Sequence, residues 1–186
     1  MIPSLSLFIL IFVMFFPSAG GSEEGIFVRD RGFSIELKAL SLDATDAFFL
    51  ARGWDGAATG WLAENGCFYK LATVHDGGEE EQAVAVDLTT WRVRSANGAW
   101  QQLAFKETWA SFLEERQVPQ PARTAFHWAV FPTHQTFHPG DRMWGMVPMG
   151  FMPGTRFDLQ AVWFVGDKRS ETVLTNLRCA PPRTTP

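Results

Sequence analysis

Several motifs of common enzymes are missing from this chain. It has no Gly-x-Ser-x-Gly elbow for a nucleophilic serine, no glycine-rich phosphate loop after a strand and no His-Glu-x-x-His helix for zinc. The spacing of its 20 acidic residues does not single out a catalytic carboxylate pair. These absences favour a binding or structural protein over an enzyme.

Charge is also scarce. Asp, Glu, Lys and Arg make up 19% of the 186 residues, and the formal net charge of -4 is spread along the chain. This balance indicates neither a nucleic acid nor an anionic membrane as a partner, since both are bound by clusters of basic residues. Aromatic residues reach 14%, with 17 Phe and 8 Trp, so the chain is too apolar for disorder. Much of the aromatic surface must therefore be buried or form a contact patch.

The first 21 residues carry no charged side chain, and residues 5–16 are apolar apart from one serine. An apolar core that ends in small residues is typical of a cleavable secretory signal, although the usual basic residue before the core is absent. The alternative is an uncleaved anchor, against which the short core and Pro17 argue. We expect a signal peptide over 1–21, a single domain over 22–180 and a disordered tail over 181–186. The mature protein is then secreted or periplasmic and has no membrane span.

The chain has only two cysteines, Cys67 and Cys179. Both lie in segments of alternating apolar residues, so both thiols are expected to point inward from strands. In an exported protein this arrangement favours a disulfide over two separate buried thiols. A metal site is less expected, because structural sites need more ligands than two lone cysteines supply. We predict a Cys67–Cys179 disulfide between two packed sheets.

Alternation of apolar and polar residues predicts strands at 32–39, 67–74, 84–88 and 157–165. A break near Thr89–Thr90 would reconcile the inward residues before it with Trp91 and Val93 after it. Asn97-Gly98 predicts a two-residue hairpin with a type I′ turn, in which both residues need positive φ. The run at 47–51 is ambiguous between helix and strand, and we expect a strand. Residues 55–60 are expected to form a loop, and 125–131 a strand.

One helix is expected over 105–116, where apolar residues recur at helical spacing and Pro119 and Pro121 prevent continuation. Short strands, one helix and a long-range cysteine pair predict a mainly all-β fold. The expected architecture is an antiparallel β-sandwich of immunoglobulin-like or cupredoxin-like type. A small β-barrel is the alternative.

Histidine and methionine cluster between residues 127 and 152, which hold His127, His134, His138, Met143, Met146, Met149 and Met152. Thioether sulfur favours Cu(I), and imidazole suits copper in either state. A spacing of three scatters the sulfurs of a strand over both faces, however, and methionine is a common core filler. The set that could converge is His134 and His138 with Met149 or Met152. Copper is therefore the one cofactor considered, and copper binding is the second functional hypothesis.

Exposed aromatic residues offer a third hypothesis, the recognition of carbohydrate or peptide. Trp54 and Trp61 flank the loop expected at 55–60 and could form a stacking platform. Packing of both side chains against the sheet is the simpler interpretation. The first hypothesis is a non-enzymatic β-sandwich that acts as a binding or accessory module for a protein partner.

Overall fold

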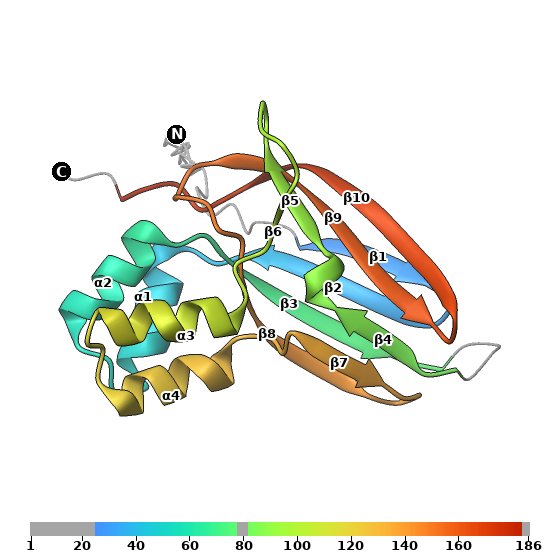
Figure 1. Ribbon diagram of the computed structural model, residues 1–186, viewed down its shortest axis with the longest axis horizontal. Coiled ribbons are helices and arrows are strands. Elements are labelled where there is room, and N and C mark those ends of the chain that lie inside the picture. Colours follow the sequence, from blue (N-terminus) through green and yellow to red (C-terminus); the bar gives the residue numbers. More distant parts are fainter. Residues whose placement is uncertain (1–24, 78–81, 184–186) are drawn as a thin grey trace, which may run out of the picture.

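The computed structural model describes residues 25–77 and 82–183, which form two antiparallel sheets with four helices at one end (Figure 1). We call the first sheet, with the order β1-β2-β3-β8, sheet A. Its strands are β1 (Ile26–Asp30), β2 (Phe33–Ala39), β3 (Phe68–His75) and β8 (Arg142–Pro148). The prediction of a mainly antiparallel β fold is confirmed.

The second sheet, sheet B, is built on its longest central strand, β9 (Arg156–Val165). On one side β9 pairs with β10 (Lys168–Arg178), and on the other it pairs with β4 (Val84–Asp87) and β5 (Arg92–Ser95). The outer strands are β7 (His134–Phe137) next to β4 and β6 (Gln101–Gln102) next to β5. Strands β4 and β5 therefore act as one interrupted strand along β9.

The interruption is a 3-10 turn, η1 (Leu88–Thr90), and it confirms the predicted break. The Asp87 carboxylate accepts hydrogen bonds from the Thr89 backbone N–H at 2.8 Å and from the Thr89 hydroxyl at 2.6 Å. This local bonding favours a turn over continued strand pairing. The turn brings Trp91 back to the core, where its Nε1 donates to the Val162 carbonyl at 2.7 Å.

The inward side chains of both sheets meet in one apolar core. Fully burying a large apolar side chain stabilises the fold by about 1.5–3 kcal/mol. The largest fully buried side chains of this core are Phe33, Ile35, Leu37, Leu71, Trp91, Phe131, Phe137 and Phe157.

The described residues form four helices where one was expected. They are α1 (Leu42–Leu50), α2 (Gly56–Asn65), α3 (Lys106–Glu115) and α4 (Gln120–Ala129). The helix predicted over 105–116 is confirmed as α3. The strands predicted at 47–51 and 125–131 and the loop predicted at 55–60 are wrong, because these residues lie in α1, α4 and α2.

Each wrong assignment has a local cause. The Ser41 hydroxyl accepts from the Ala44 N–H at 3.1 Å, and the Asp55 carboxylate accepts from the Ala58 N–H at 2.7 Å, so both residues cap helix N-termini. Pro121 lies in the first turn of α4, where a proline costs no helical hydrogen bond. The prolines that prevent continuation of α3 therefore also lie at the beginning of α4. As a result His127 lies in a helix and not in the predicted strand.

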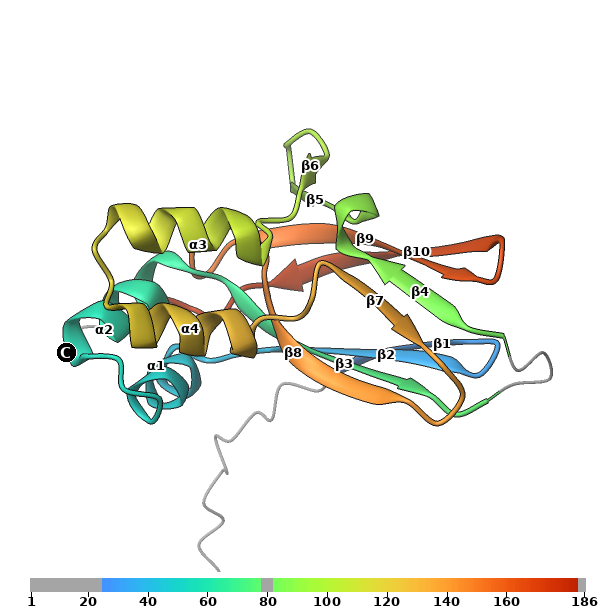
Figure 2. The ribbon, with the colours of Figure 1, turned by 60° about the horizontal axis from the view of Figure 1, so that its bottom comes forward.

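The helices form a second apolar cluster on the outer face of sheet A. Phe68 of β3 and Met146 of β8 point away from the core between the sheets and pack among helix residues. Their neighbours in this cluster include Phe49, Leu113 and Phe126 of the helices and Trp54 of the α1–α2 connection. Figure 2 shows the helices gathered at one end of the sheets. They cover this end of the sheet, whereas outward side chains farther along it, such as Phe27 and Trp144, are exposed.

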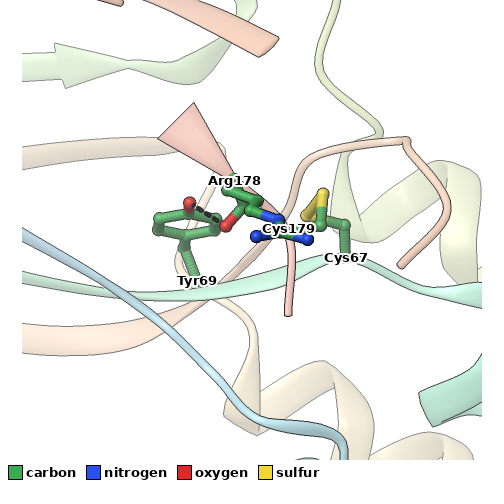
Figure 3. Close-up of a disulfide and its surroundings, with 4 residues drawn as sticks. All are labelled: Cys67, Tyr69, Arg178 and Cys179. Carbon is green, nitrogen blue, oxygen red and sulfur yellow. Dashed lines mark hydrogen bonds between the residues drawn. A yellow bond between two sulfur atoms is a disulfide. The ribbon is translucent and has the colours of Figure 1, made fainter. Parts of the chain in front are cut away.

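The predicted disulfide is present. Cys67 directly precedes β3 and Cys179 directly follows β10, with 5.3 Å between their Cα atoms (Figure 3). Beside it the Tyr69 hydroxyl donates to the Arg178 carbonyl at 2.7 Å. The bridge and this hydrogen bond tie sheet A to sheet B at the helical end. Such a bridge persists in oxidising compartments.

The hairpin at Asn97-Gly98 is confirmed, but its turn type is wrong. Strands β5 and β6 pair through Arg92 and Gln102, and the Gly98 N–H donates to the Ser95 carbonyl at 2.9 Å. Neither Asn97 nor Gly98 has a positive φ. A type I′ turn joins strands paired up to the turn itself, whereas here residues 94–100 separate the last paired residues.

The predicted signal peptide, 1–21, lies outside the described residues, as do 184–186 of the predicted tail. Within the described ranges, no helix combines the length and apolar character needed to cross a bilayer. Residues 181–183 lie beside α1, where Arg183 forms ion pairs with Asp43 and Asp46.

We predict that removing the disulfide lowers the free energy of unfolding by up to about 4–5 kcal/mol, the chain-entropy value for a closed loop of more than a hundred residues. Urea unfolding of a Cys67→Ser, Cys179→Ser double variant measures this loss. Labelling of unreduced, denatured wild-type protein should find no free thiol, and two labelled thiols would overturn the assignment.

Alanine should lower the stability of the fold at Gly145 but leave it nearly unchanged at Gly98. A Cβ on Gly145 would lie 2.8 Å from the Phe131 backbone, which cannot move aside because its N–H donates to the Met146 carbonyl. A Cβ on Gly98 would meet the Ser95 hydroxyl, the end of a side chain that can rotate away. We expect Gly145→Ala to destabilise by about 1–3 kcal/mol. Gly98→Ala should stay within about 0.5 kcal/mol. Equal losses in urea unfolding would contradict this.

The link between Arg183 and α1 should depend on pH. Burial raises the pKa of Asp46, but hydrogen bonds from Thr59 and Arg183, with the Arg183 charge, outweigh burial and hold that pKa below its ordinary value. A carboxyl with a lowered folded-state pKa stabilises the fold above its unfolded pKa of about 3.9 and loses this contribution as pH falls through the folded value. Arg183→Gln should therefore lower Tm at pH 7 more than at pH 3. An equal reduction at both values would contradict the ion-pair account.

Candidate functional site

The four residues predicted to bind copper are not brought together. His134 begins β7 with its Nδ1 3.1 Å from Asp87 Oδ1, and His138 follows the end of that strand. Met149 is buried beyond the far end of β8, and Met152 is exposed in the next loop. The seven-residue strand β8 lies between His138 and Met149. At about 3.3 Å per residue it spans roughly 23 Å. This geometry does not support the expected site.

The other methionines of the cluster also have structural surroundings, since Met146 belongs to the apolar cluster beneath the helices and Met143 packs against the core between the sheets. In the described part of the chain, no group of three or more His, Cys, Asp or Glu side chains is placed to hold a metal ion.

The two predicted ligand-binding tryptophans differ in exposure. Trp54 is only 4% exposed, and its Nε1 donates to the Ala122 carbonyl at 2.8 Å, so it packs inside the fold, in line with the simpler interpretation, and offers no stacking surface. Trp61 of α2 is half-buried at the surface. Its ring centroid lies 5.2 Å from that of Phe112, and the Arg116 guanidinium lies 4.3 Å from its centroid.

Trp61 is part of an apolar groove along α3. Thr108 and Phe112 of α3 and the C-cap residue Arg116 follow at intervals of four and so lie on one helix face. A hollow of about 200 Å³ lies at the start of this face and is lined by Ala104, Thr108, Trp109 and Phe112. A second hollow of about 170 Å³ lies at its end and is lined by Ala58, Trp61, Arg116 and Val118. We call these eight residues the α3 groove.

The aromatic floor of the groove is fixed by contacts with the cluster beneath it. The Trp109 ring packs on Phe68, Phe112 and Phe126 at centroid distances of 5.7, 5.6 and 5.6 Å. These distances lie in the favourable range for aromatic pairs, which contribute about 0.5–1.5 kcal/mol beyond burial. The groove is therefore rigid on its inner side.

The far end of the groove is shaped by the end of α3. The Val118 N–H donates to the Leu113 carbonyl at 3.0 Å and the Gln117 N–H to the Glu114 carbonyl at 2.9 Å, with Gln117 at a φ of 56°. This is the hydrogen-bond pattern of a Schellman motif. It turns the chain sharply, so that Val118 lines the second hollow next to Trp61.

Arg116 is the one charged residue of the groove. Its guanidinium lies over the Trp61 ring and also 4.6 Å from the Phe112 centroid, and such cation–π contacts contribute about 0.5–1 kcal/mol at exposed sites. No carboxylate within the described ranges forms an ion pair with it. Its hydrogen-bond donors are therefore free for a carboxylate or carbonyl from outside.

The sequence analysis identified the helix that forms one wall of the α3 groove and one residue of the other wall. The helical spacing of Phe105, Trp109 and Phe112 predicted α3, and Trp61 was selected as a surface aromatic. The groove was missed because its other wall is α2, whose first half was expected to form a loop over 55–60. Comparison of the chain with protein-family models, curated proteins and solved structures finds no match.

Proposed function

We propose that the protein is a non-enzymatic binding module that takes up a segment of a partner protein in the α3 groove. The observation that carries this proposal is the pair of hollows aligned along one helix. Their lining residues Thr108 and Arg116 are eight positions apart, which corresponds to about 12 Å along an α-helix.

The size of the hollows favours side chains over a small-molecule ligand. Pockets for cofactors and drug-sized ligands usually have about 300–1,000 Å³. A cavity of about 150 Å³ holds one benzene ring. Hollows of about 200 and 170 Å³ therefore each suit one apolar side chain. Two such anchors two helical turns apart are what an amphipathic helix presents to a groove.

Arg116 adds a polar requirement. A guanidinium held over two rings is pre-oriented and can form two parallel hydrogen bonds with a carboxylate. The expected partner segment carries two apolar anchors and an acidic residue near the second anchor.

We also propose that the two sheets, on which the helices of the groove pack, form a β-sandwich. This is supported by the single core that the inward side chains of both sheets share. Its immunoglobulin-like or cupredoxin-like type stays a prediction. Secretion or periplasmic location also stays a prediction, and the Cys67–Cys179 disulfide supports it.

A random library of displayed helical peptides tests the groove. Selection on the immobilised, disulfide-bonded protein should enrich peptides with two apolar residues about seven positions apart and a nearby Asp or Glu. Thr108→Leu and Ala58→Leu, which fill the two hollows, should weaken binding of a selected peptide in fluorescence polarisation by roughly tenfold or more. Arg116→Gln should weaken only peptides that carry the acidic residue.

Ala110→Leu is the matched control, because Ala110 is exposed on α3 but does not line either hollow. Its affinity should equal that of the wild type. Enriched peptides without two anchors, or equal binding by the filling variants and the control, would refute the proposal.

A further inference from the structure

The open part of the outer face of sheet A carries a row of side chains that crosses all four strands. Phe27 of β1, Glu36 of β2, Ala72 of β3 and Trp144 of β8 are consecutive partners in the strand register. Their neighbours Leu37, Leu71 and Gly145 are buried, so this row faces outward. Figure 2 shows the four strands side by side, running from the helical end toward the opposite end of the molecule.

Two aromatic rings stand at the ends of this row. Phe27 is 61% and Trp144 is 56% exposed. Three strand spacings separate them, or about 14 Å. The small Ala72 lies beside Trp144 and leaves the side of its ring open. On the helical side the ring meets Phe48 of α1 edge-on at 6.4 Å, and this contact holds it in place.

Basic side chains flank the row on both sides. Lys38 and Lys70 are register partners on the side of the row that is nearer the helices. Arg29 and Arg142 belong to the next line of register partners on its other side. Arg29 forms an ion pair with Asp76. Lys38, Lys70 and Arg142 form no ion pair with any described residue. Three unpaired cations thus surround one carboxylate, Glu36, on a chain whose net charge is -4.

Exposed aromatic rings beside cations without ion pairs favour a ligand that has both negative charge and ring systems. Exposed aromatic faces stack on sugar or base rings, and unpaired cations attract carboxylate, sulfate or phosphate groups. Glu36 lies within the row, where it would repel a dense phosphate layer but can accept hydrogen bonds from sugar hydroxyls. The Cys67–Cys179 bridge is typical of an oxidising compartment outside the cytosol, which is consistent with a ligand met outside the cell.

We propose that the outer face of sheet A binds an acidic polysaccharide, with Trp144 as the stacking platform and Lys38, Lys70 and Arg142 as the cations that contact its acidic groups. This site is independent of the α3 groove, because the two share no residue.

Affinity measurements with defined polymers test the proposal. The probes are polygalacturonate, which carries carboxylates, and dextran sulfate, which carries sulfates, with neutral dextran as the uncharged reference. The wild type should bind at least one of the acidic polymers and not dextran, and the affinity should fall as salt rises. The polymer bound more tightly identifies the acidic group.

Trp144→Ala should weaken binding by roughly tenfold, a typical loss for one stacking ring, and Trp144→Phe should restore part of it. The matched control is Trp128→Ala, which removes an 81% exposed tryptophan of α4 and should leave binding unchanged. Lys70→Gln and Arg142→Gln should each lower the affinity and its salt dependence, whereas Arg178→Gln on β10 should not. Circular dichroism checks that each variant is folded.

Three results would overturn the proposal. They are no binding to either acidic polymer at low salt, equal effects of Trp144→Ala and Trp128→Ala, and preferential binding of poly(dT) or of phosphatidylglycerol vesicles over both polysaccharides. None of these results bears on the peptide experiment, so the two proposals can fail separately.

Discussion

The arrangement of this molecule depends on the burial of two apolar side chains on the outer face of sheet A. Phe68 and Met146 point away from the core between the sheets, so sheet A needs a second cover at that end. Four helices supply it, from two insertions far apart in the chain, one between β2 and β3 and the other between β6 and β7. The Cys67–Cys179 bridge lies at the same end, directly before Phe68. Loss of this cover would expose apolar surface on sheet A, so the helices are part of the fold and not an appendage.

The same constraint defines both candidate sites. Where α2 and α3 meet over the buried aromatics, neighbouring rings remain half-exposed and line the α3 groove. Where the helices end, the outward residues of sheet A change from Phe68 and Met146 to Ala72 and Trp144, and the face becomes open. A protein with a wholly polar outer face on sheet A would need neither the helices nor the groove between them.

The sequence predicted what depends on short-range pattern. Alternation located β2, β3, β4 and β9. The change of the inward-facing positions from even to odd residue numbers located the break at Thr89–Thr90, and two cysteines in an apolar context predicted their bridge. Sequence reasoning failed where contacts with distant residues determine the secondary structure of a short segment. Residues 47–51 are equally compatible with strand and helix, and their helix is stabilised by packing of Phe49 on Trp54 and Phe126. The row from Phe27 to Trp144 was also beyond sequence reasoning, because it depends on a strand order in which β8 returns next to β3.

Exposure, and not residue type, decides what each tryptophan can do here. Trp54 and Trp91 donate hydrogen bonds to buried carbonyls and serve the two cores. Trp144 has the same ring, but it lies on the edge strand β8 of sheet A, is 56% exposed and meets Phe48 edge-on. Because Phe48 is held by Arg52 above its ring and by its neighbour Phe49 in the helical cluster, the orientation of Trp144 depends on α1 being packed. The helical cover therefore positions a ring that it does not bury, and the open face of the sheet is pre-organised by the same cluster that closes its other end.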